Sequence, residues 1–335
     1  MNLRVTVLGA GSFGTTMAHL FTQNTPTLLW CRRLEIAEEI NRDHRNESYL
    51  PGHPISPDLR ATASLEEAVS EADVLVMGVP TVGMRASLEE VSKYIRPWVP
   101  VVSLAKGLEP GSHLRMTEVI RDVLPDHRPA ALSGPNLARE IMSGFAAASV
   151  IACEDPELAK QLQGLFNCGV FRVYTNRDVI GCELGGALKN VIAIATGMGD
   201  GLGVGDNTRS AVITRGLAEL TRLGVAMGGE PATFAGLAGI GDLVATCTSA
   251  QSRNRHVGEE LCRGRTIDEI SKAMNQVAEG VKTTAVAIEL AERYSVELPI
   301  AQEVYGVLYE GHTAEDAYRG LTRRSPGSEA ESESD

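Results

Sequence analysis

A lysine interrupts an otherwise apolar segment in the second half of the chain and is a candidate for acid–base chemistry. Residues 183–195 read Glu-Leu-Gly-Gly-Ala-Leu-Lys-Asn-Val-Ile-Ala-Ile-Ala, and we expect them to form a helix. Apolar surroundings disfavour the charged form of Lys189 and lower its pKa, which suits proton transfer near neutral pH. Gly185 lies one turn earlier on the same face and leaves room beside the ammonium group. The segment alone also allows Lys189 to extend along the helix edge into water.

A second group of polar residues is suited to a phosphate monoester. Ser252, Arg253 and Asn254 place a hydroxyl, a guanidinium and an amide next to each other, and charge-assisted hydrogen bonds from such groups hold phosphate oxygens. A polar helix start with Ser252 as its cap has the same composition. Asp242 follows Gly241 and precedes apolar residues, so it is either a helix cap or an acceptor for substrate hydroxyls.

A glycine-rich turn near the start of the chain predicts a dinucleotide site. Gly9, Gly11 and Gly14 enclose Ser12 and Phe13 between an expected strand at 3–8 and an expected helix at 15–21. In this arrangement the first glycine makes the turn, the second admits a pyrophosphate, and the third lets the helix pack on the strand. The helix N-terminus then offers N–H groups to the phosphates. The other interpretation is an ordinary strand–helix turn with spare glycines.

The end of the next expected strand indicates which dinucleotide binds. Residues 27–30 form an apolar run, and Arg32 and Arg33 follow it. An NAD-selective fold carries an acidic residue here, whereas arginine accommodates a 2′-phosphate. NADP(H) is therefore favoured. Glu35 lies close enough to serve a ribose hydroxyl, which leaves NAD(H) open as well.

Alternating strands and helices through the first half predict a mostly parallel sheet covered on both faces. We expect strands at 72–80, 99–104 and 130–133, and two more at 147–152 and 170–174 that could pair as a hairpin at the sheet edge. Ligands bind beyond the carboxyl ends of strands in such sheets. Lys106, Gly134 and Asn136 follow two of these strands and so lie on the ligand side.

Helical periods replace strands from about residue 180 to about residue 320. The chain of 335 residues suits two domains. We predict a dinucleotide-binding domain at 1–180, a helical substrate domain at 181–322 and a disordered, acidic, serine-rich tail at 323–335.

Composition excludes several classes of partner. The formal net charge is −12, which argues against nucleic acid or an anionic membrane surface. We see no apolar run of membrane-spanning length and no signal peptide. The six cysteines form no CxxC pair and no zinc spacing, so we expect free thiols, no metal site and a cytoplasmic protein.

The motifs together resemble the NAD(P)-dependent glycerol-3-phosphate dehydrogenases of bacterial type. The matching segments follow the order of that family, span most of residues 1 to about 320, and lie at 9–14, 103–108, 133–136, 184–190, 239–243, 251–255 and 277–280. The more usual bacterial pattern has Ser or Thr where this chain has Asn136, although the asparagine version also occurs in the family.

The resemblance implies a fold, a reaction and a set of site residues. The fold would be an α/β Rossmann-type doubly wound sheet followed by an all-α domain, similar to 6-phosphogluconate dehydrogenase. The reaction would be reversible reduction of dihydroxyacetone phosphate to sn-glycerol 3-phosphate for phospholipid synthesis, in a cleft between the domains of a homodimer. Lys189 would be the proton donor and acceptor. The dinucleotide would contact Gly9, Gly11, Ser12, Phe13, Gly14, Arg32, Arg33, Lys106, Ala138, Arg253, Val277 and Glu279. The substrate would contact Lys106, Gly134, Asn136, Lys189, Asp242, Ser252, Arg253 and Asn254.

Two other functions compete with this one. A dehydrogenase of the 6-phosphogluconate or β-hydroxyacid type has the same domain plan, but usually places its asparagine one helical turn after the lysine, whereas Lys189 and Asn190 are adjacent. A non-catalytic NADP(H)-binding sensor needs the glycine-rich turn but has no use for Lys106, Lys189 and Asp242 together.

Overall fold

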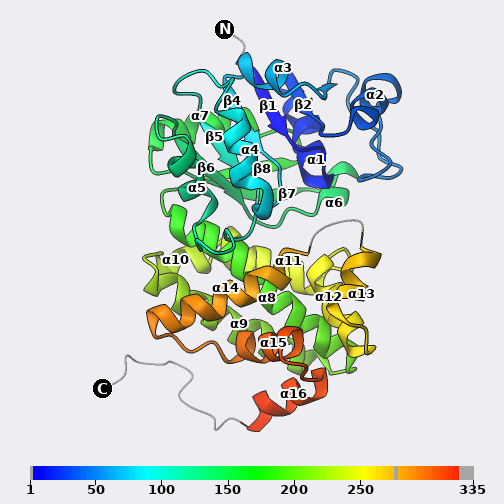
Figure 1. Cartoon of the computed structure of the whole chain (residues 1–335), viewed down its shortest axis with the longest axis vertical. Coiled ribbons are helices and arrows are strands. Elements are labelled where there is room, and N and C mark those ends of the chain that lie inside the picture. Colours follow the sequence, from blue (N-terminus) through cyan, green and yellow to red (C-terminus); the bar gives the residue numbers. More distant parts are fainter. Residues whose placement is uncertain (1–2, 275–277, 324–335) are drawn as a thin grey trace.

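The chain folds into a sheet-containing half and a helical half, which are stacked along the long axis of the molecule (Figure 1). The computed structural model describes residues 3–274 and 278–323. Residue 277 and nearly all of the predicted acidic tail lie outside the described residues. The first half holds an eight-stranded sheet in the order β3-β2-β1-β4-β5-β6-β7-β8.

The strands are short and mostly buried. Their bounds are β1 Val5–Leu8, β2 Thr27–Trp30, β3 Arg60–Thr62, β4 Val74–Met77, β5 Val101–Ser103, β6 Pro129–Ser133, β7 Ala147–Ala152 and β8 Phe171–Asn176. Strands β1 to β6 pair in parallel, with Leu8 beside both Trp30 and Met77, so that their carboxyl ends meet at one edge. This is the edge at which a doubly wound sheet binds ligands.

The last two strands correct one expectation. Strands β7 and β8 do not form a hairpin, because they run parallel to each other and α7 crosses between them. The antiparallel pair is instead β6 with β7. The sequence analysis also did not predict β3, whose three residues are too few to show a period.

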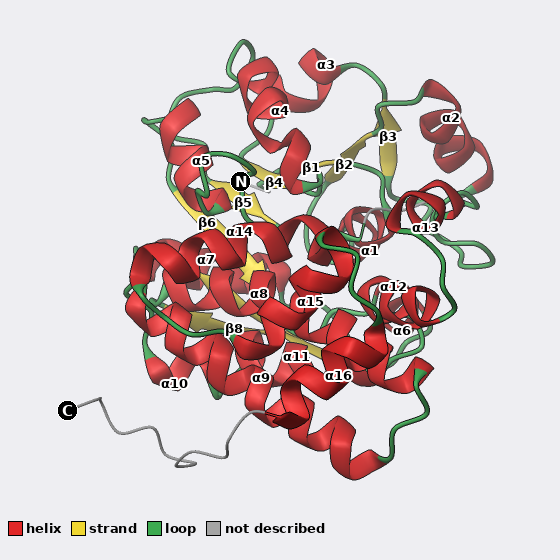
Figure 2. Ribbon diagram, turned by 60° about the horizontal axis from the view of Figure 1, so that its bottom comes forward, coloured by secondary structure: helices red, strands yellow, loops and turns green. Residues whose placement is uncertain are grey.

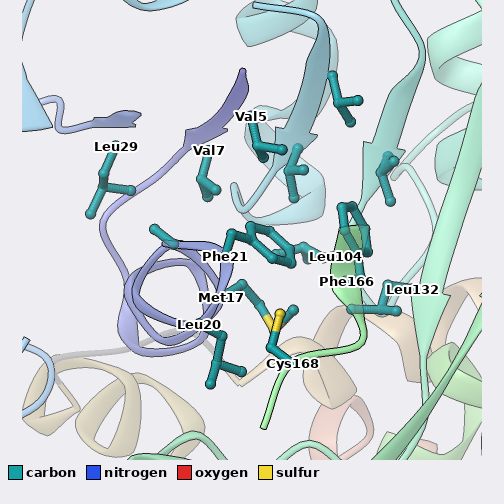
Figure 3. Close-up of a cluster of buried hydrophobic side chains, with 14 of the residues drawn as sticks. Val5, Val7, Met17, Leu20, Phe21, Leu29, Leu104, Leu132, Phe166 and Cys168 are labelled. Carbon is teal, nitrogen blue, oxygen red and sulfur yellow. The ribbon is translucent and has the colours of Figure 1, made fainter. Parts of the chain in front are cut away.

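Helices cover both faces of the sheet. Successive side chains of a strand point to opposite faces, and here both sets are apolar and need to be buried. Their bounds are α1 Ser12–Phe21, α2 Leu34–Asp43, α3 Leu65–Ser70, α4 Met84–Val91, α5 Met116–Val123, α6 Ala138–Met142 and α7 Pro156–Phe166, with a 3₁₀ turn, η1, at Thr81–Gly83. Val5 and Val7 of β1 face one core, in which Phe21 stacks on Phe166 with ring centroids 4.4 Å apart (Figure 3). Leu8 faces the core on the other side.

The second half is built around one long helix. Its helices are α8 Val179–Gly201, α9 Asp206–Ala226, α10 Pro231–Phe234, α11 Asp242–Thr248, α12 Arg253–Cys262, α13 Ile267–Ala273, α14 Glu279–Tyr294, α15 Pro299–Tyr309 and α16 Ala314–Arg323, with a π-helical turn, η2, at Leu237–Gly241. Among the described residues after β8 there is no further strand. Helices α9, α11, α12, α14 and α15 all contact α8, which lies among them in Figure 2.

Helix α8 is also longer and more apolar than the sequence analysis recognised. By length and composition it could cross a membrane, but 94% of that apolar window is buried inside the protein. Its apolar residues form the core of the helical half together with Leu220, Leu243 and Val304.

Glycines let α12 approach α8 closely. A Cβ atom on Gly197 of α8 would overlap the carbonyl oxygen of Arg255, and a Cβ on Gly258 of α12 would overlap that of Ile194. Only glycine fits at such a backbone contact. The first turn of α12, which carries Arg253 and Asn254, is thereby held at a fixed position against the helix that carries Lys189.

Candidate active site

One carboxylate joins two lysines where the two halves of the chain meet. Asp242 accepts from Lys189 Nζ through Oδ1 at 2.6 Å and from Lys106 Nζ through Oδ2 at 2.7 Å. Lys106 follows β5, Lys189 lies in the middle of α8, and Asp242 is the first residue of α11. Lys189 is 5% exposed and Asp242 2% exposed. A carboxylate shared by two ammonium groups satisfies charges that would be costly to bury alone.

Burial gives Lys189 a pKa in the range that proton transfer requires. Desolvation lowers the pKa of its ammonium group to about 8, with the charge of Asp242 opposing this shift and that of Lys106 adding to it. The alternative in which Lys189 reaches water along the helix edge is wrong, because the ammonium is enclosed by Asp242 and by the hydroxyl of Thr246, to which it also donates.

Thr246 is a site residue that the sequence analysis missed. Its hydroxyl donates to the backbone carbonyl of Asp242 at 2.6 Å and accepts from Lys189. Thr246 lies four residues after Asp242 in α11, so the two side chains share one helix face. That spacing is the signal that could have identified it.

Gly185 and Gly186 let other parts of the chain approach α8 closely. A Cβ on Gly185 would lie 2.6 Å from the carbonyl oxygen of Ala238, and one on Gly186 would lie 2.6 Å from Ser133 Oγ. The glycines therefore admit η2 and the end of β6 against α8. The space beside Gly185 is filled by the backbone of η2 rather than left open next to Lys189.

The loops after β5 and β6 are tied together at the site. Lys106 Nζ donates to the carbonyl oxygen of Gly134 at 2.6 Å, and Asn190 Nδ2 donates to the carbonyl oxygen of Lys106 at 3.1 Å. Gly134 has φ of +137°, which a residue with a side chain rarely adopts. The structure thus brings Lys106, Gly134, Lys189 and Asp242 into direct contact, as their positions at the ends of strands and on α8 suggested.

Asn136 lies on the loop after β6, and in the described part of the chain only one of the two polar groups of its side chain has a hydrogen-bond partner. Its Oδ1 accepts from the hydroxyl of Ser149, and its Nδ2 is buried without a hydrogen-bond partner among the described residues. A buried donor without an acceptor is unfavourable and is a natural contact for a ligand oxygen.

The residues predicted to bind the phosphate make some of their hydrogen bonds within the protein. Ser252 caps α12 by accepting from the N–H of Arg255 at 3.2 Å. Asn254 donates to Asn190 Oδ1 at 2.8 Å and accepts from the N–H of Gly280 at 2.9 Å. Asn254 therefore fastens the start of α12 to α8 and α14. Ser252 caps α12 itself, as the cap interpretation had allowed.

Arg253 is the charged member of this group and lies near Glu279. The residue as a whole is exposed, yet its guanidinium is sufficiently enclosed that desolvation lowers its pKa, while the negative charge of Glu279 acts in the opposite direction. Arg253 thus presents a positive charge at the start of α12, where the helix N-terminus also favours anions.

The glycine-rich turn fits a dinucleotide. A Cβ on Gly9 would lie 2.5 Å from the carbonyl oxygen of Gly78, and one on Gly14 would overlap that of Gly9, so both positions require glycine. Gly11 faces open space at the N-terminus of α1. Ser12 donates to the carbonyl oxygen of Tyr49 at 2.8 Å, and Phe13 packs against the core of the sheet. The turn thus leaves room for a pyrophosphate at Gly11 and at the helix N-terminus.

The arginine pair lies beside this turn. Gly9 N–H donates to the carbonyl oxygen of Trp30 at 3.1 Å, which joins the turn to the end of β2. Arg32 and Arg33 follow that strand and are exposed, and the guanidinium of Arg33 lies 5.7 Å from the ring centroid of Tyr49.

Contacts between the halves bring Glu279 toward the sheet. Its carboxylate accepts from the hydroxyl of Thr81 at 2.7 Å, across the loop that follows β4. Thr81 was not expected at the site, although a hydroxyl directly after the strand expected at 72–80 was a usable signal. Ala138 begins α6, on the loop that carries Asn136, and Val277 lies outside the described residues.

Comparisons with known proteins identify relatives along the whole chain. Residues 4–159 match the family model for the NAD-dependent glycerol-3-phosphate dehydrogenase N-terminus, and residues 178–319 match the model for its C-terminus. A glycerol-3-phosphate dehydrogenase (NAD(P)+) of Sphingopyxis alaskensis is 59% identical over 98% of this chain and 99% of its own length. One from Mycobacterium avium is 55% identical over 97% of this chain and 96% of its own length.

The fold is shared with a solved structure that carries the same enzyme name as these relatives. The crystal structure of glycerol-3-phosphate dehydrogenase from Coxiella burnetii superposes with a TM-score of 0.92 at 35% identity, and the match covers 96% of this chain and 99% of that one.

Proposed function

Because the chain belongs to the NAD-dependent glycerol-3-phosphate dehydrogenase family, we propose that it catalyses the reversible reduction of dihydroxyacetone phosphate to sn-glycerol 3-phosphate. The observation that carries this proposal is the pair of ammonium groups, Lys106 and Lys189, held on the buried carboxylate of Asp242. In the cell the product would supply phospholipid synthesis.

Lys189 acts as the general acid and base in this proposal. When the ketone is reduced, negative charge develops on its carbonyl oxygen, and Lys189 Nζ donates a proton to that oxygen. In the reverse direction the neutral amine accepts the proton of the alcohol. A pKa of about 8 allows both states of the amine near neutral pH. Asp242 and Thr246 each accept from one of the three N–H donors of the ammonium, which leaves the third for the ketone oxygen.

Basic and amide groups from both halves hold the substrate. Arg253 and the N-terminus of α12 would bind the phosphate, while Lys106 and Asn136 donate hydrogen bonds from the sheet side. Gly134 and Asp242 complete the contacts around Lys106. Ser252 and Asn254 would contact the substrate as well, and their hydrogen bonds within the protein place the first turn of α12.

The dinucleotide site takes NADP(H) in preference to NAD(H) in this proposal. Arg32 and Arg33 would receive the 2′-phosphate, and Gly9, Gly11 and Gly14 the pyrophosphate. Further contacts come from Ser12, Phe13, Lys106, Ala138, Arg253, Val277 and Glu279. The bound cofactor would supply the hydride for reduction and accept one in the reverse reaction.

A homodimer and a cytoplasmic location complete the proposal and rest on the family resemblance. The thiols that the structure describes are all free, which agrees with a reducing compartment.

The first test measures two reactions of the full-length protein. One is oxidation of NADPH with dihydroxyacetone phosphate, and the other, in the opposite direction, is reduction of NADP+ with β-hydroxyacid substrates. Rapid oxidation with dihydroxyacetone phosphate alone supports the proposal. Turnover confined to a hydroxyacid indicates a dehydrogenase of another family. Binding of NADPH without oxidation by any small phosphorylated ketone indicates a cofactor sensor.

A further inference from the structure

We propose that Ser149 is a positioning residue, which holds the side chain of Asn136 where its NH₂ group contacts the phosphorylated substrate. The inference rests on the proposed function, because it assigns a role within the same site. Ser149 was not among the residues singled out from the sequence. It enters the site only through the antiparallel direction of β7.

The topology of the sheet brings Ser149 to the ligand edge. Because β7 runs antiparallel to β6, the amino end of β7 lies beside the carboxyl end of β6, where Ser133 pairs with Val150. Had β7 run parallel to β6, as the preceding strands run to one another, its first residues would lie at the opposite edge. Ser149 is 0% exposed and precedes Val150 directly.

The loop after β6 is pressed against Ser149. A Cβ on Gly134 would lie 3.0 Å from Ser149 Cα and 3.2 Å from its Oγ. The carbonyl oxygen of Gly134 is at the same time held by Lys106 Nζ at 2.6 Å. The loop is therefore fixed between the lysine that faces Asp242 and the backbone of β7, and Asn136 starts from a defined position.

The hydrogen bond from Ser149 holds the amide of Asn136 in place. An asparagine side chain carries an acceptor on one side and a donor group on the other. The Ser149 hydroxyl donates to Oδ1, so Nδ2 turns to the other side, where it is buried and has no hydrogen-bond partner among the described residues. Phosphate, carbonyl and hydroxyl oxygens are all acceptors. In the position held by Ser149, the buried Nδ2 donor of Asn136 is thus suited to an oxygen of a phosphorylated ketone.

Direct binding measures this role without turnover. In protein saturated with NADPH, sn-glycerol 3-phosphate forms a complex that cannot react, because both ligands are reduced, and its Kd can be obtained by calorimetry. We expect Ser149→Ala to raise this Kd by about 3- to 10-fold, the usual effect of one neutral hydrogen bond. The KM for dihydroxyacetone phosphate rises in parallel, while kcat and the Kd for NADPH stay within about two-fold.

Thr6→Val is the matched control for loss of a buried hydroxyl. Thr6 lies on β1 of the same sheet, is buried, and donates to the carbonyl oxygen of Ala68 at 2.8 Å. Its removal lowers the melting temperature but leaves the Kd for sn-glycerol 3-phosphate unchanged. If Ser149→Ala does not fold, Ser149→Cys replaces it with the same expectation, because a thiol is a weak donor of similar size.

A double-mutant cycle shows whether Ser149 acts through Asn136. In an Asn136→Ala background, Ser149→Ala should change the Kd by less than about 1.5-fold, because the amide that it holds is gone. An equal effect in both backgrounds, or no effect of Ser149→Ala in the native background, overturns the inference. Wild-type protein that fails to bind sn-glycerol 3-phosphate at all refutes the proposed function instead.

Discussion

At the scale of single residues, the site depends on a lysine whose pKa is set by two opposing effects of its surroundings. Burial favours the neutral amine of Lys189, and Asp242 favours the ammonium. These opposing effects leave a pKa near 8, in place of the ordinary lysine value of about 10.4. The proposed reaction needs a different protonation state in each direction, so its pH dependence follows from this balance.

The two directions of the reaction should depend oppositely on pH. Reduction requires the ammonium of Lys189, so kcat/KM for dihydroxyacetone phosphate should fall as pH rises through about 8. Oxidation requires the neutral amine, so kcat/KM for sn-glycerol 3-phosphate should rise through the same pH. Initial rates in both directions from pH 6 to pH 10 (roughly two units on either side of that pKa) check this. Parallel profiles in the two directions would contradict the assignment of Lys189.

The phosphate contact is tested by Arg253→Ala. We expect the KM for dihydroxyacetone phosphate to rise by roughly 10- to 150-fold, because a charge-assisted hydrogen bond contributes about 1.5–3 kcal/mol. The affinity for NADPH falls too if the side chain also reaches the cofactor. Arg265→Ala is the control, because Arg265 pairs with Glu260 at 2.6 Å and lies just beyond the carboxyl end of α12, away from Arg253. An unchanged KM in the Arg253 variant would remove it from the site.

Cofactor choice is tested by replacing Arg32 with Asp and Arg33 with Ala together. The double variant loses the guanidinium groups that would bind a 2′-phosphate and gains a carboxylate suited to a ribose hydroxyl. We expect NADPH binding to weaken far more than NADH binding, measured as separate Kd values. If the affinities for NADPH and NADH fall equally, the arginines do not bind the 2′-phosphate.

Residue chemistry was easier to predict than residue contacts. Lys106, Lys189 and Asp242 could be identified because lysine and aspartate stand out against apolar or glycine-rich neighbours. That they form one ion cluster could not be predicted, since it depends on three elements meeting in space. For the same reason the hydrogen bonds that join Asn254 to α8 and α14 could not be predicted. The cap formed by Ser252 could, because it needs only residues of α12.

At the scale of elements, glycines decide how closely α12 lies on α8. Gly197→Ala would place a methyl group against the carbonyl oxygen of Arg255 and push the helices apart. We expect a loss of about 1–3 kcal/mol in the free energy of unfolding and a raised KM for dihydroxyacetone phosphate, because the start of α12 moves. Gly164→Ala in α7 is the control: nothing lies near its Cβ position, so this change should stabilise the protein by up to about 1 kcal/mol. Equal stability of the Gly197 variant and wild type would contradict the packing argument.

Element positions followed the sequence where the hydrophobic pattern was strong. The apolar runs at 27–30 and 147–152 are strands within those bounds, and the run at 183–195 is the middle of α8. The direction of the last strands could not be predicted, because a hydrophobic period does not encode strand polarity. This matters for the site, since the antiparallel placement of β7 is what brings Ser149 to the ligand edge.

At the scale of the whole molecule, polar contacts join the sheet half to the helical half around the site. Arg115, which precedes α5, donates to Glu183 of α8 at 2.9 Å, and the N–H of Thr117 donates to the same carboxylate. Thr81, on the loop after β4, donates to Glu279 of α14. These contacts place the loops that carry Lys106 and Gly134 against the helix that carries Lys189, so neither half contains the complete site.

The central claim is that the joined halves form a reductase whose proton comes from Lys189. The most direct measurement is turnover of dihydroxyacetone phosphate with NADPH by Lys189→Met, which keeps the bulk of the side chain and removes the ammonium. We predict a fall in kcat of roughly 10²- to 10⁴-fold, with the Kd for NADPH and cooperative unfolding retained. Near-normal turnover by this variant would contradict the mechanism, even though the fold and the family would stand.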